Sequence, residues 1–425
     1  MRICVLTAIR SNEVESLKFN NVYTFIYVDA LPLKYINEYN TPFLASLAKD
    51  GKTFVLQNIP GYSFGIQSTM LSGKLPQETK HWMPYIYIPE PSEKHNRLSI
   101  YHNPFLQTIF REHRYLPKPL RYVYQYSLCS PVFGTFRMNT AKLCGMPIEY
   151  LDDFYIYPYY YMNENPFFLE FKRLCEDKYG VNVYYFGHSL RRVQKDLVEF
   201  LKNISITVDN TTQDTMFFIY LDDLDGVGHK LGVSTEQWFK TLRIIDMSLF
   251  YLYKLLSKLT RMVYFVVFSD HGVCTADEYI DLDSMFRRYD VKDKILYFID
   301  ATLAFIWINN YRYKELIMKL LDKKLRNKAK IFDIETDKEV LKHYGVYFRN
   351  REYGDVVVQT KPCKEFFPNF YSITTPLKGL HGFWPDEVVQ QAFIITPHKN
   401  RDLETYKPRH IKDIREYLLS LVNLT

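Results

Sequence analysis

Short runs of β-branched and aromatic residues recur along the chain, separated by segments in which apolar residues follow a helical spacing. The apolar runs predict buried strands at Val22–Val28, Met216–Leu221, Met262–Phe268, Leu303–Ile308, Asp355–Gln359 and Ala392–Ile395. The pattern Ser234-Thr-Glu-Gln is typical of a helix start, and apolar residues then recur at steps of three and four. Strands that alternate with helices predict an α/β fold with a mostly parallel central sheet covered by helices on both faces.

The segment from about residue 81 to residue 185 interrupts this rhythm, because it is rich in tyrosine and proline and shows few clean periods. Between Lys94 and Lys142 it carries eight lysines and arginines against one acid, Glu112, and residues 149–161 are acidic and aromatic. We therefore predict a catalytic core of residues 1–80 and 186–425 with a basic, aromatic-rich insertion or cap at 81–185. The basic residues either pair with the acidic stretch or face an anionic substrate.

The composition indicates a folded protein rather than a disordered or fibrous one, since 47% of the 425 residues are hydrophobic and 24% are charged. A formal net charge of +6 is too mild to indicate a polyanionic partner. The lysine-rich segment Lys314–Lys330 has its apolar residues at helical spacing, so its lysines are predicted to form a solvated helix face. A nucleic-acid partner is therefore not expected, and the sequence does not indicate an oligomeric state.

Cysteine usage and the apolar runs bear on the cellular compartment. The six cysteines form no C-x-x-C pair, so free buried thiols are expected rather than a disulfide framework or a structural zinc site. They are Cys4, Cys129, Cys144, Cys175, Cys274 and Cys363. The apolar run before Arg10 is too short for a signal peptide, and no run reaches the roughly 18 apolar residues of a membrane span. The expectation from these features is a cytoplasmic protein without a transmembrane segment.

Metal-ligand residue types follow several of the predicted strands. They are Asp29, Asp225 with His229, Asp270 with His271, and His381. In parallel sheets the carboxyl ends of the strands meet at one edge, so these side chains are expected to converge there. Three carboxylates and three imidazoles suit two divalent ions, zinc above all, with manganese or magnesium possible. A single aspartate after a strand is usually a turn or cap residue, but that explanation accounts poorly for the four occurrences together.

The order of these elements resembles the type I phosphodiesterase/nucleotide pyrophosphatase branch of the alkaline phosphatase superfamily. The matching elements are Asp29, Ser63-Phe64 running to Ser72-Gly73, Asp225-Gly-Val-Gly-His229-Lys-Leu-Gly232, Ser269-Asp270-His271-Gly272 and His381-Gly382. The resemblance covers about residues 20–80 and 215–397 and implies an alkaline-phosphatase-like core, with the insertion outside it. It also implies that one metal is held by Asp225, His229 and His381. The second would be held by Asp29, Asp270, His271 and the oxygen of the nucleophile.

The resemblance implies that the nucleophile is Ser63, because the family nucleophile lies ten residues before the glycine of a Thr/Ser-Gly pair and precedes a phenylalanine. Ser68 and Thr69 remain alternatives, whereas Ser72 is expected to be structural. The family usually has an asparagine three residues after the nucleophile, where this chain has Ile66 followed by Gln67. Gln67 could replace that amide as a phosphoryl contact. Phe64 matches the position that can stack on a leaving-group base, although packing at the helix start explains it equally well.

These observations predict a metal-dependent hydrolase that cleaves phosphodiester or pyrophosphate bonds of a small anionic substrate through a phosphoryl-serine intermediate. One alternative is a phosphotransferase that passes the phosphoryl-linked group to a glycan or lipid hydroxyl, with the insertion as acceptor site. An alternative of another class is a non-catalytic protein that binds anions or nucleic acid through basic and aromatic residues. That alternative leaves the seven candidate site positions without an explanation, so a nucleic-acid partner is disfavoured. A sulfatase is also disfavoured, because Ser63-Phe-Gly-Ile-Gln lacks the proline and arginine of the sulfatase motif.

Overall fold

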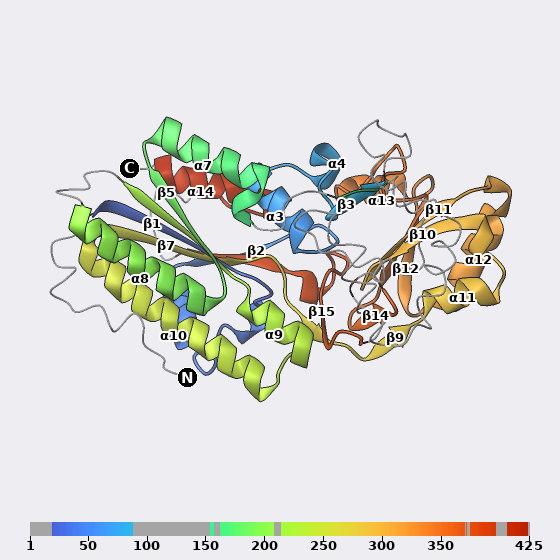
Figure 1. Ribbon diagram of the computed structural model, residues 1–425, viewed down its shortest axis with the longest axis horizontal. Coiled ribbons are helices and arrows are strands. Elements are labelled where there is room, and N and C mark those ends of the chain that lie inside the picture. The colour runs from blue at the N-terminus through green and yellow to red at the C-terminus, as the bar shows by residue number, and fades with distance from the viewer. Residues whose placement is uncertain are drawn as a thin grey trace, which may run out of the picture.

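The computed structural model describes residues 19–87, 154–156, 162–207, 214–369, 371, 375–396 and 406–423. Its main element is a six-stranded sheet in the order β2-β16-β7-β1-β6-β5 (Figure 1). The strands are β1 (Phe19–Val28), β2 (Lys52–Leu56), β5 (Asn182–His188), β6 (Thr215–Leu221), β7 (Thr260–Ser269) and β16 (Ala392–Thr396). Strands β7, β1, β6 and β5 are parallel, whereas β16 runs antiparallel to both of its neighbours. The predicted mostly parallel sheet is thus confirmed.

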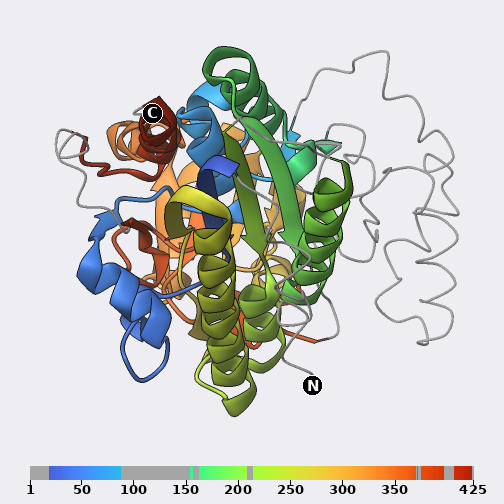
Figure 2. The same ribbon diagram turned by 90° about the vertical axis from the view of Figure 1, so that its left-hand side faces the viewer.

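Helices cover both faces of this sheet (Figures 1 and 2). On one face lie α2 (Pro42–Asp50), α8 (Leu190–Thr207) and α10 (Glu236–Leu259), and on the other lie α3 (Ser63–Ser72), α7 (Pro166–Tyr179) and α14 (Ile414–Asn423). Alternate residues of β1 enter the two cores, with Ile26 on one side and Phe25 and Tyr27 on the other. A strand buried on both faces has no polar side to show, which explains its continuous apolar sequence.

A second, smaller lobe was not predicted from the sequence. It contains a four-stranded antiparallel sheet of β10 (Ile295–Ile299), β11 (Leu303–Ile308), β13 (Val356–Thr360) and β12 (Ala329–Asp333). Helices α11 (Leu282–Arg288) and α12 (Lys314–Leu325) pack on one face, and an aromatic core with Trp82 and Trp384 covers the other. The strands predicted at 303–308 and 355–359 exist, but they belong to this sheet.

Short elements complete the two lobes. Two-stranded pairs are formed by β8 (Cys274–Thr275) with β15 (Gly379–Leu380), by β9 (Glu278–Ile280) with β14 (Lys364–Phe366), and by β3 (Tyr85–Tyr87) with β4 (Phe154–Ile156). Short helices are α4 (Pro76–Thr79), α9 (Asp223–Leu231) and α13 (Lys338–His343). The pair β8–β15 lies next to the main sheet edge, where the candidate ligands are found.

Two local predictions about helices agree closely with the structure. Helix α10 is capped by Thr235, whose hydroxyl accepts a hydrogen bond from Trp238 N at 3.2 Å, one residue after the predicted start at Ser234. In α12 the apolar positions Ile317 and Leu321 are buried, whereas Lys319 is 75% exposed. Lys319, Lys323 and Lys324 are exposed and form a solvated face, as predicted. The helix ends at Leu325, however, and Lys330 lies in β12, so the predicted helix segment was too long.

The prediction of free thiols is wrong for two cysteines. Cys274 and Cys363 form a disulfide with a Cα–Cα distance of 5.6 Å, although 89 residues separate them in sequence. Cys175 is a free, buried thiol as expected, and the other three cysteines lie outside the described residues. A disulfide is typical of oxidising compartments, and the expected cytoplasmic location stays a prediction.

The predicted insertion, residues 81–185, is described only at its two ends. Trp82 and Tyr85 pack in the second lobe, and α7 and β5 belong to the main sheet layer, so the core extends into the predicted insertion from both sides. The basic segment Lys94–Lys142 and most of the acidic stretch lie outside the described residues. Among the described helices, none combines the length and the apolar character that crossing a bilayer requires.

Candidate active site

The candidate ligands come from three adjacent strands and one neighbouring loop. Residues Val28 of β1 and Leu221 of β6 are register partners, and Tyr27 of β1 is the partner of Phe268 of β7. The three strands therefore end at the same edge of the sheet. Asp29 directly follows β1, α9 follows β6, and Asp270 directly follows β7.

The first cluster consists of Asp225, His229 and His381. The Nε2 atoms of the two imidazoles lie 3.1 Å apart, and Asp225 Oδ1 lies 3.2 Å from that of His229 and 3.4 Å from that of His381. His229 Nδ1 lies 2.8 Å from the carbonyl oxygen of Gly379, which can only accept, so we assign the proton of this ring to Nδ1. Its Nε2 then carries a lone pair toward Asp225 and His381, as a metal ligand requires.

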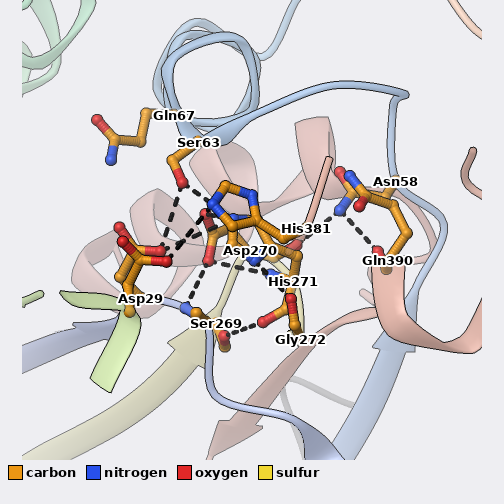
Figure 3. Close-up of polar contacts among 12 residues, drawn as sticks. Asp29, Asn58, Ser63, Gln67, Ser269, Asp270, His271, Gly272, His381 and Gln390 are labelled. Carbon is orange, nitrogen blue, oxygen red and sulfur yellow. Dashed lines mark hydrogen bonds and ion pairs between the residues drawn. The ribbon is translucent and has the colours of Figure 1, made fainter. Parts of the chain in front are cut away.

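The second cluster consists of Asp29, Asp270 and His271 (Figure 3). All three residues are buried. His271 Nε2 lies 3.1 Å from Asp270 Oδ2 and 3.7 Å from Asp29 Oδ1. Its Nδ1 lies 2.9 Å from the Gly272 carbonyl oxygen, which again leaves the lone pair on Nε2. The two clusters adjoin, because the rings of His271 and His381 stack with their centroids 4.0 Å apart.

Ser63 is the first residue of α3, and its side chain points into the second cluster (Figure 3). Ser63 Oγ lies 2.9 Å from His271 Nε2 and 3.4 Å from Asp29 Oδ1. The start of a helix favours anions through its unpaired N–H groups and its dipole. The alternative Ser68 is fully buried, and its hydroxyl accepts a hydrogen bond from Asn165 Nδ2 at 3.3 Å. Thr69 is also fully buried, so the geometry favours Ser63 as the nucleophile.

The backbone of the Asp270-His271 turn is held by polar side chains that the sequence did not single out. Asn58 Nδ2 donates to the Asp270 carbonyl at 2.6 Å and to the Gln390 carbonyl at 2.9 Å (Figure 3). Ser269 Oγ donates to the His271 carbonyl at 3.0 Å and accepts from the backbone N–H of Leu31 at 3.0 Å. These bonds fix the direction in which the two ligand side chains leave the strand.

Tyr220 was also missed. It lies on β6, and its hydroxyl donates a 2.6 Å hydrogen bond to Asp29 Oδ2. The ring of Tyr220 stacks on Tyr27 of the neighbouring strand with a centroid distance of 4.8 Å. Short hydrogen bonds to a carboxylate are among the stronger ones in proteins, so Tyr220 orients Asp29 with its other oxygen toward His271.

The electrostatics of the two clusters are unbalanced without a cation. Burial and the nearby carboxylate of Asp270 raise the pKa of Asp29 well above its ordinary value. Burial and the neighbouring imidazoles lower the pKa of His381 well below its ordinary value. Burial lowers the pKa of His271, but the adjacent Asp270 outweighs it and raises that pKa to about 9. The groups thus compete for protons in a buried space where separated charges are costly.

The donor set fits divalent cations. Asp225 Oδ1 and Asp270 Oδ2 are buried and have no hydrogen-bond partner among the described residues. The first cluster offers two imidazoles and one carboxylate, and the second offers two carboxylates and one imidazole. Within each cluster the ligand atoms lie within 4.8 Å of one another. Such oxygen and nitrogen sets suit zinc or another first-row divalent ion. The six residues predicted as metal ligands are therefore brought together in the two predicted groups.

The two predicted substrate contacts lie beside Ser63 on α3. Gln67 is buried, and its Nε2 donates to the hydroxyl of Tyr27 at 3.3 Å. The ring of Phe64 lies 6.3 Å from that of His81, which contacts Phe167 in turn at 5.0 Å. Their roles in substrate binding stay predictions.

A family comparison identifies the class of protein that this fold and site define. The family model of type I phosphodiesterases and nucleotide pyrophosphatases matches residues 24–384. The protein is a phosphoric diester hydrolase with an alkaline-phosphatase-like fold. It belongs to the type I phosphodiesterase/nucleotide pyrophosphatase family. Because this family consists of enzymes, the alternative of a non-catalytic binding protein is disfavoured. No curated protein sequence matches the chain significantly.

Solved structures share this fold over about 95% of the chain. Murine ectonucleotide pyrophosphatase/phosphodiesterase 5 superposes with a TM-score of 0.56 at 16% identity, covering 95% of both chains. The human protein of the same name gives a TM-score of 0.57 at 13% identity, again covering 95% of both chains. An inactive variant of the murine protein, solved in complex with AMP, gives a TM-score of 0.54 at 17% identity, covering 96% of both. At these identities the likeness shows the fold alone.

Proposed function

We propose that this protein cleaves phosphodiester or pyrophosphate bonds with two divalent metal ions and Ser63 as the nucleophile. The observation that carries the proposal is the position of the Ser63 hydroxyl. It stands at the start of α3 and within 2.9 Å of a buried imidazole that belongs to one of two adjacent ligand clusters.

Asp225, His229 and His381 would hold one ion, and Asp29, Asp270 and His271 would hold the other together with Ser63 Oγ. When bound, the ions lower the pKa of the serine hydroxyl and neutralise charge on the transferred phosphoryl group and the leaving oxygen. Zinc is favoured over manganese or magnesium because three of the six protein ligands are imidazoles.

The residues of the chain supply the nucleophile and bind the transferred phosphoryl group. Ser63 loses its hydroxyl proton to solvent, and Oγ forms a bond to phosphorus as the bond from phosphorus to the leaving oxygen breaks. The leaving group departs with its oxygen, which takes up a proton from solvent. The start of α3 presents backbone N–H groups to the transferred phosphoryl group, which Ser63 now carries. Water attacks that phosphorus, breaks its bond to Ser63 Oγ and regenerates the hydroxyl.

The proposed substrate is a nucleotide-type diester or pyrophosphate. The family description names nucleotide pyrophosphatases, and one structural relative was solved in complex with AMP. Phe64, next to the nucleophile, offers an aromatic face on which a base could stack. Transfer to an alcohol acceptor remains a separate prediction, because the segment expected to bind the acceptor lies mostly outside the described residues.

The proposal is tested by comparing Ser63→Ala with Ser68→Ala as the matched control. We expect Ser63→Ala to lower kcat at least about 1,000-fold on the p-nitrophenyl ester of thymidine monophosphate, because the covalent route is lost. Ser68→Ala should stay within a few-fold of the wild type, since its hydroxyl faces Asn165 and not the clusters. Near-normal turnover by Ser63→Ala would contradict the proposal, and a preference for p-nitrophenyl phosphate would point to a monoesterase instead.

A further inference from the structure

His381 is held differently from the other two imidazoles of the site. The Nδ1 atoms of His229 and His271 lie within hydrogen-bond distance of the carbonyl oxygens of Gly379 and Gly272. His381 Nδ1 is buried and has no hydrogen-bond partner among the described residues. A metal-binding histidine usually owes its ring orientation to a hydrogen bond at the second nitrogen, so something else must orient this ring.

Ring packing supplies part of the orientation. The imidazole of His381 stacks on His271 at a centroid distance of 4.0 Å and an interplanar angle of 14°. The Tyr62 ring makes an edge contact with the same imidazole at a centroid distance of 5.6 Å and an interplanar angle of 86°. Gly382 follows with φ of +83°, and a Cβ at this position would overlap the Tyr62 ring. The backbone at residues 381–382 therefore passes directly against Tyr62.

Two polar side chains of the second lobe hold the same stretch of backbone. Thr302, just before β11, places its hydroxyl 3.1 Å from the carbonyl oxygens of His381 and of Gly382. Gln359, near the end of β13, donates from Nε2 to the Gly382 carbonyl at 2.6 Å and to the Thr302 carbonyl at 3.2 Å. Both side chains are fully buried, so water does not compete for these bonds.

The same group of residues reaches the nucleophile. Tyr62 is the cap residue of α3 and directly precedes Ser63. Its hydroxyl accepts a hydrogen bond from the backbone N–H of Thr302 at 2.7 Å, and the Thr302 hydroxyl lies 2.9 Å away. Thr302 therefore contacts both the backbone of His381 and the residue that positions Ser63.

The neighbours of Gln359 fix the orientation of its side-chain amide. Its Oε1 is buried without a hydrogen-bond partner among the described residues. Exchanging the amide oxygen and nitrogen would set that oxygen against two carbonyl oxygens, so the orientation is fixed by its neighbours. An apolar side chain of similar size would remove this donor from the Gly382 and Thr302 carbonyls. The amide group of Gln359 therefore holds the backbone directly after His381.

We propose that Thr302 and Gln359 are positioning residues, through which the second lobe fixes the His381 imidazole and aligns it with Ser63. The inference rests on the proposed two-metal function. It gives the antiparallel sheet of the second lobe a part in catalysis, although that sheet supplies none of the predicted ligands.

The test compares Thr302→Val, which removes the hydroxyl at nearly constant size, with Thr302→Ser, which keeps it. Gln359→Met removes the amide at similar length, so it tests the inference even if Thr302→Val does not fold. Thr360→Val is the matched control, because Thr360 is a buried threonine on the same strand whose hydroxyl has no hydrogen-bond partner among the described residues. For each protein, Zn²⁺ binding is measured by competition with a chromogenic chelator, alongside kcat, KM and the melting temperature of the metal-free form.

We expect Thr302→Val and Gln359→Met to lower the affinity for one of the two Zn²⁺ ions about 10- to 100-fold. Their kcat should fall at least about 10-fold at nearly constant KM, while Thr302→Ser and Thr360→Val stay near the wild type. Unchanged Zn²⁺ affinity in both loss variants, or a lowered melting temperature as the only effect, would overturn the inference and leave the proposed function intact. A wild-type protein that takes up no Zn²⁺ would contradict the proposed function, and this inference with it.

Discussion

Asp300 is a buried carboxyl group whose titration should be visible in the stability of the protein. It lies at the end of β10, is fully buried, and accepts hydrogen bonds from the Tyr85 hydroxyl at 2.8 Å and from the backbone N–H of Ala301 at 2.7 Å. Burial raises the pKa of Asp300 to about 7, although these hydrogen bonds oppose the rise. The perturbation that tests this is Asp300→Asn, which keeps the shape and removes the titration.

The sign follows from comparing the folded and unfolded states. The pKa is about 7 when folded and near 3.8 when unfolded, so between these values the folded state binds the extra proton. Stability from this group is therefore present in full below pH of about 4 and is lost as the pH rises through about 7. A difference of about 3 in pKa corresponds to about 4 kcal/mol as an order of magnitude.

The assay is urea unfolding of the wild type and Asp300→Asn at a series of pH values from 4 to 8.5, with a chelator present. The difference in unfolding free energy between the two proteins isolates Asp300 from all other titrating groups. We expect the variant to gain up to about 4 kcal/mol relative to the wild type between pH 4 and pH 8. A difference that stays constant across this range would refute the assignment of a raised pKa to Asp300.

Three further predictions concern the metal site and the disulfide. Tyr220→Phe should lower the affinity for one of the two metal ions about 10- to 100-fold, because Asp29 loses its 2.6 Å hydrogen bond. Unchanged affinity in a chelator competition would count against this role of Tyr220. Dialysis against a chelator should abolish diesterase activity and added Zn²⁺ should restore it, whereas activity that survives full metal removal, checked by elemental analysis, would speak against a metal-dependent reaction. The free energy of unfolding of the double variant Cys274→Ala/Cys363→Ala should be about 2–5 kcal/mol lower than that of the wild type, because the disulfide closes a long loop. Equal stability of the variant and the wild type under oxidising conditions would argue that the disulfide contributes nothing.

The main sheet could be predicted from the sequence because its central strands are buried on both faces and read as unbroken apolar runs. Strand β5 (Asn182–His188) escaped notice because it lies in the tyrosine-rich segment and contains Gly187, which weakens a strand pattern. The second sheet escaped notice for another reason. Its strands at 303–308 and 355–359 were found, but β10 and β12 were not. A hydrophobic pattern also carries no information on which distant strand each will pair with.

The ligand residues could be predicted because they directly follow strands or belong to compact motifs, and parallel strands bring their carboxyl ends together. The residues that hold them could not. Tyr220 lies inside an apolar strand and reads as a core aromatic, since nothing local shows that its hydroxyl reaches the end of β1. Asn58, Thr302 and Gln359 act through backbone carbonyls more than 20 residues away, and such contacts leave no local signal. The disulfide was missed likewise, because its cysteines are 89 residues apart and match no motif.

The most direct test of the central claim is the location of metal ions in crystals of the Zn²⁺-loaded protein by anomalous diffraction at the zinc edge. We predict two ions. One is ligated by Asp225, His229 and His381, and the other by Asp29, Asp270 and His271 with Ser63 Oγ as a further ligand. A single ion, or two ions bound elsewhere with Ser63 in contact with neither, would contradict it.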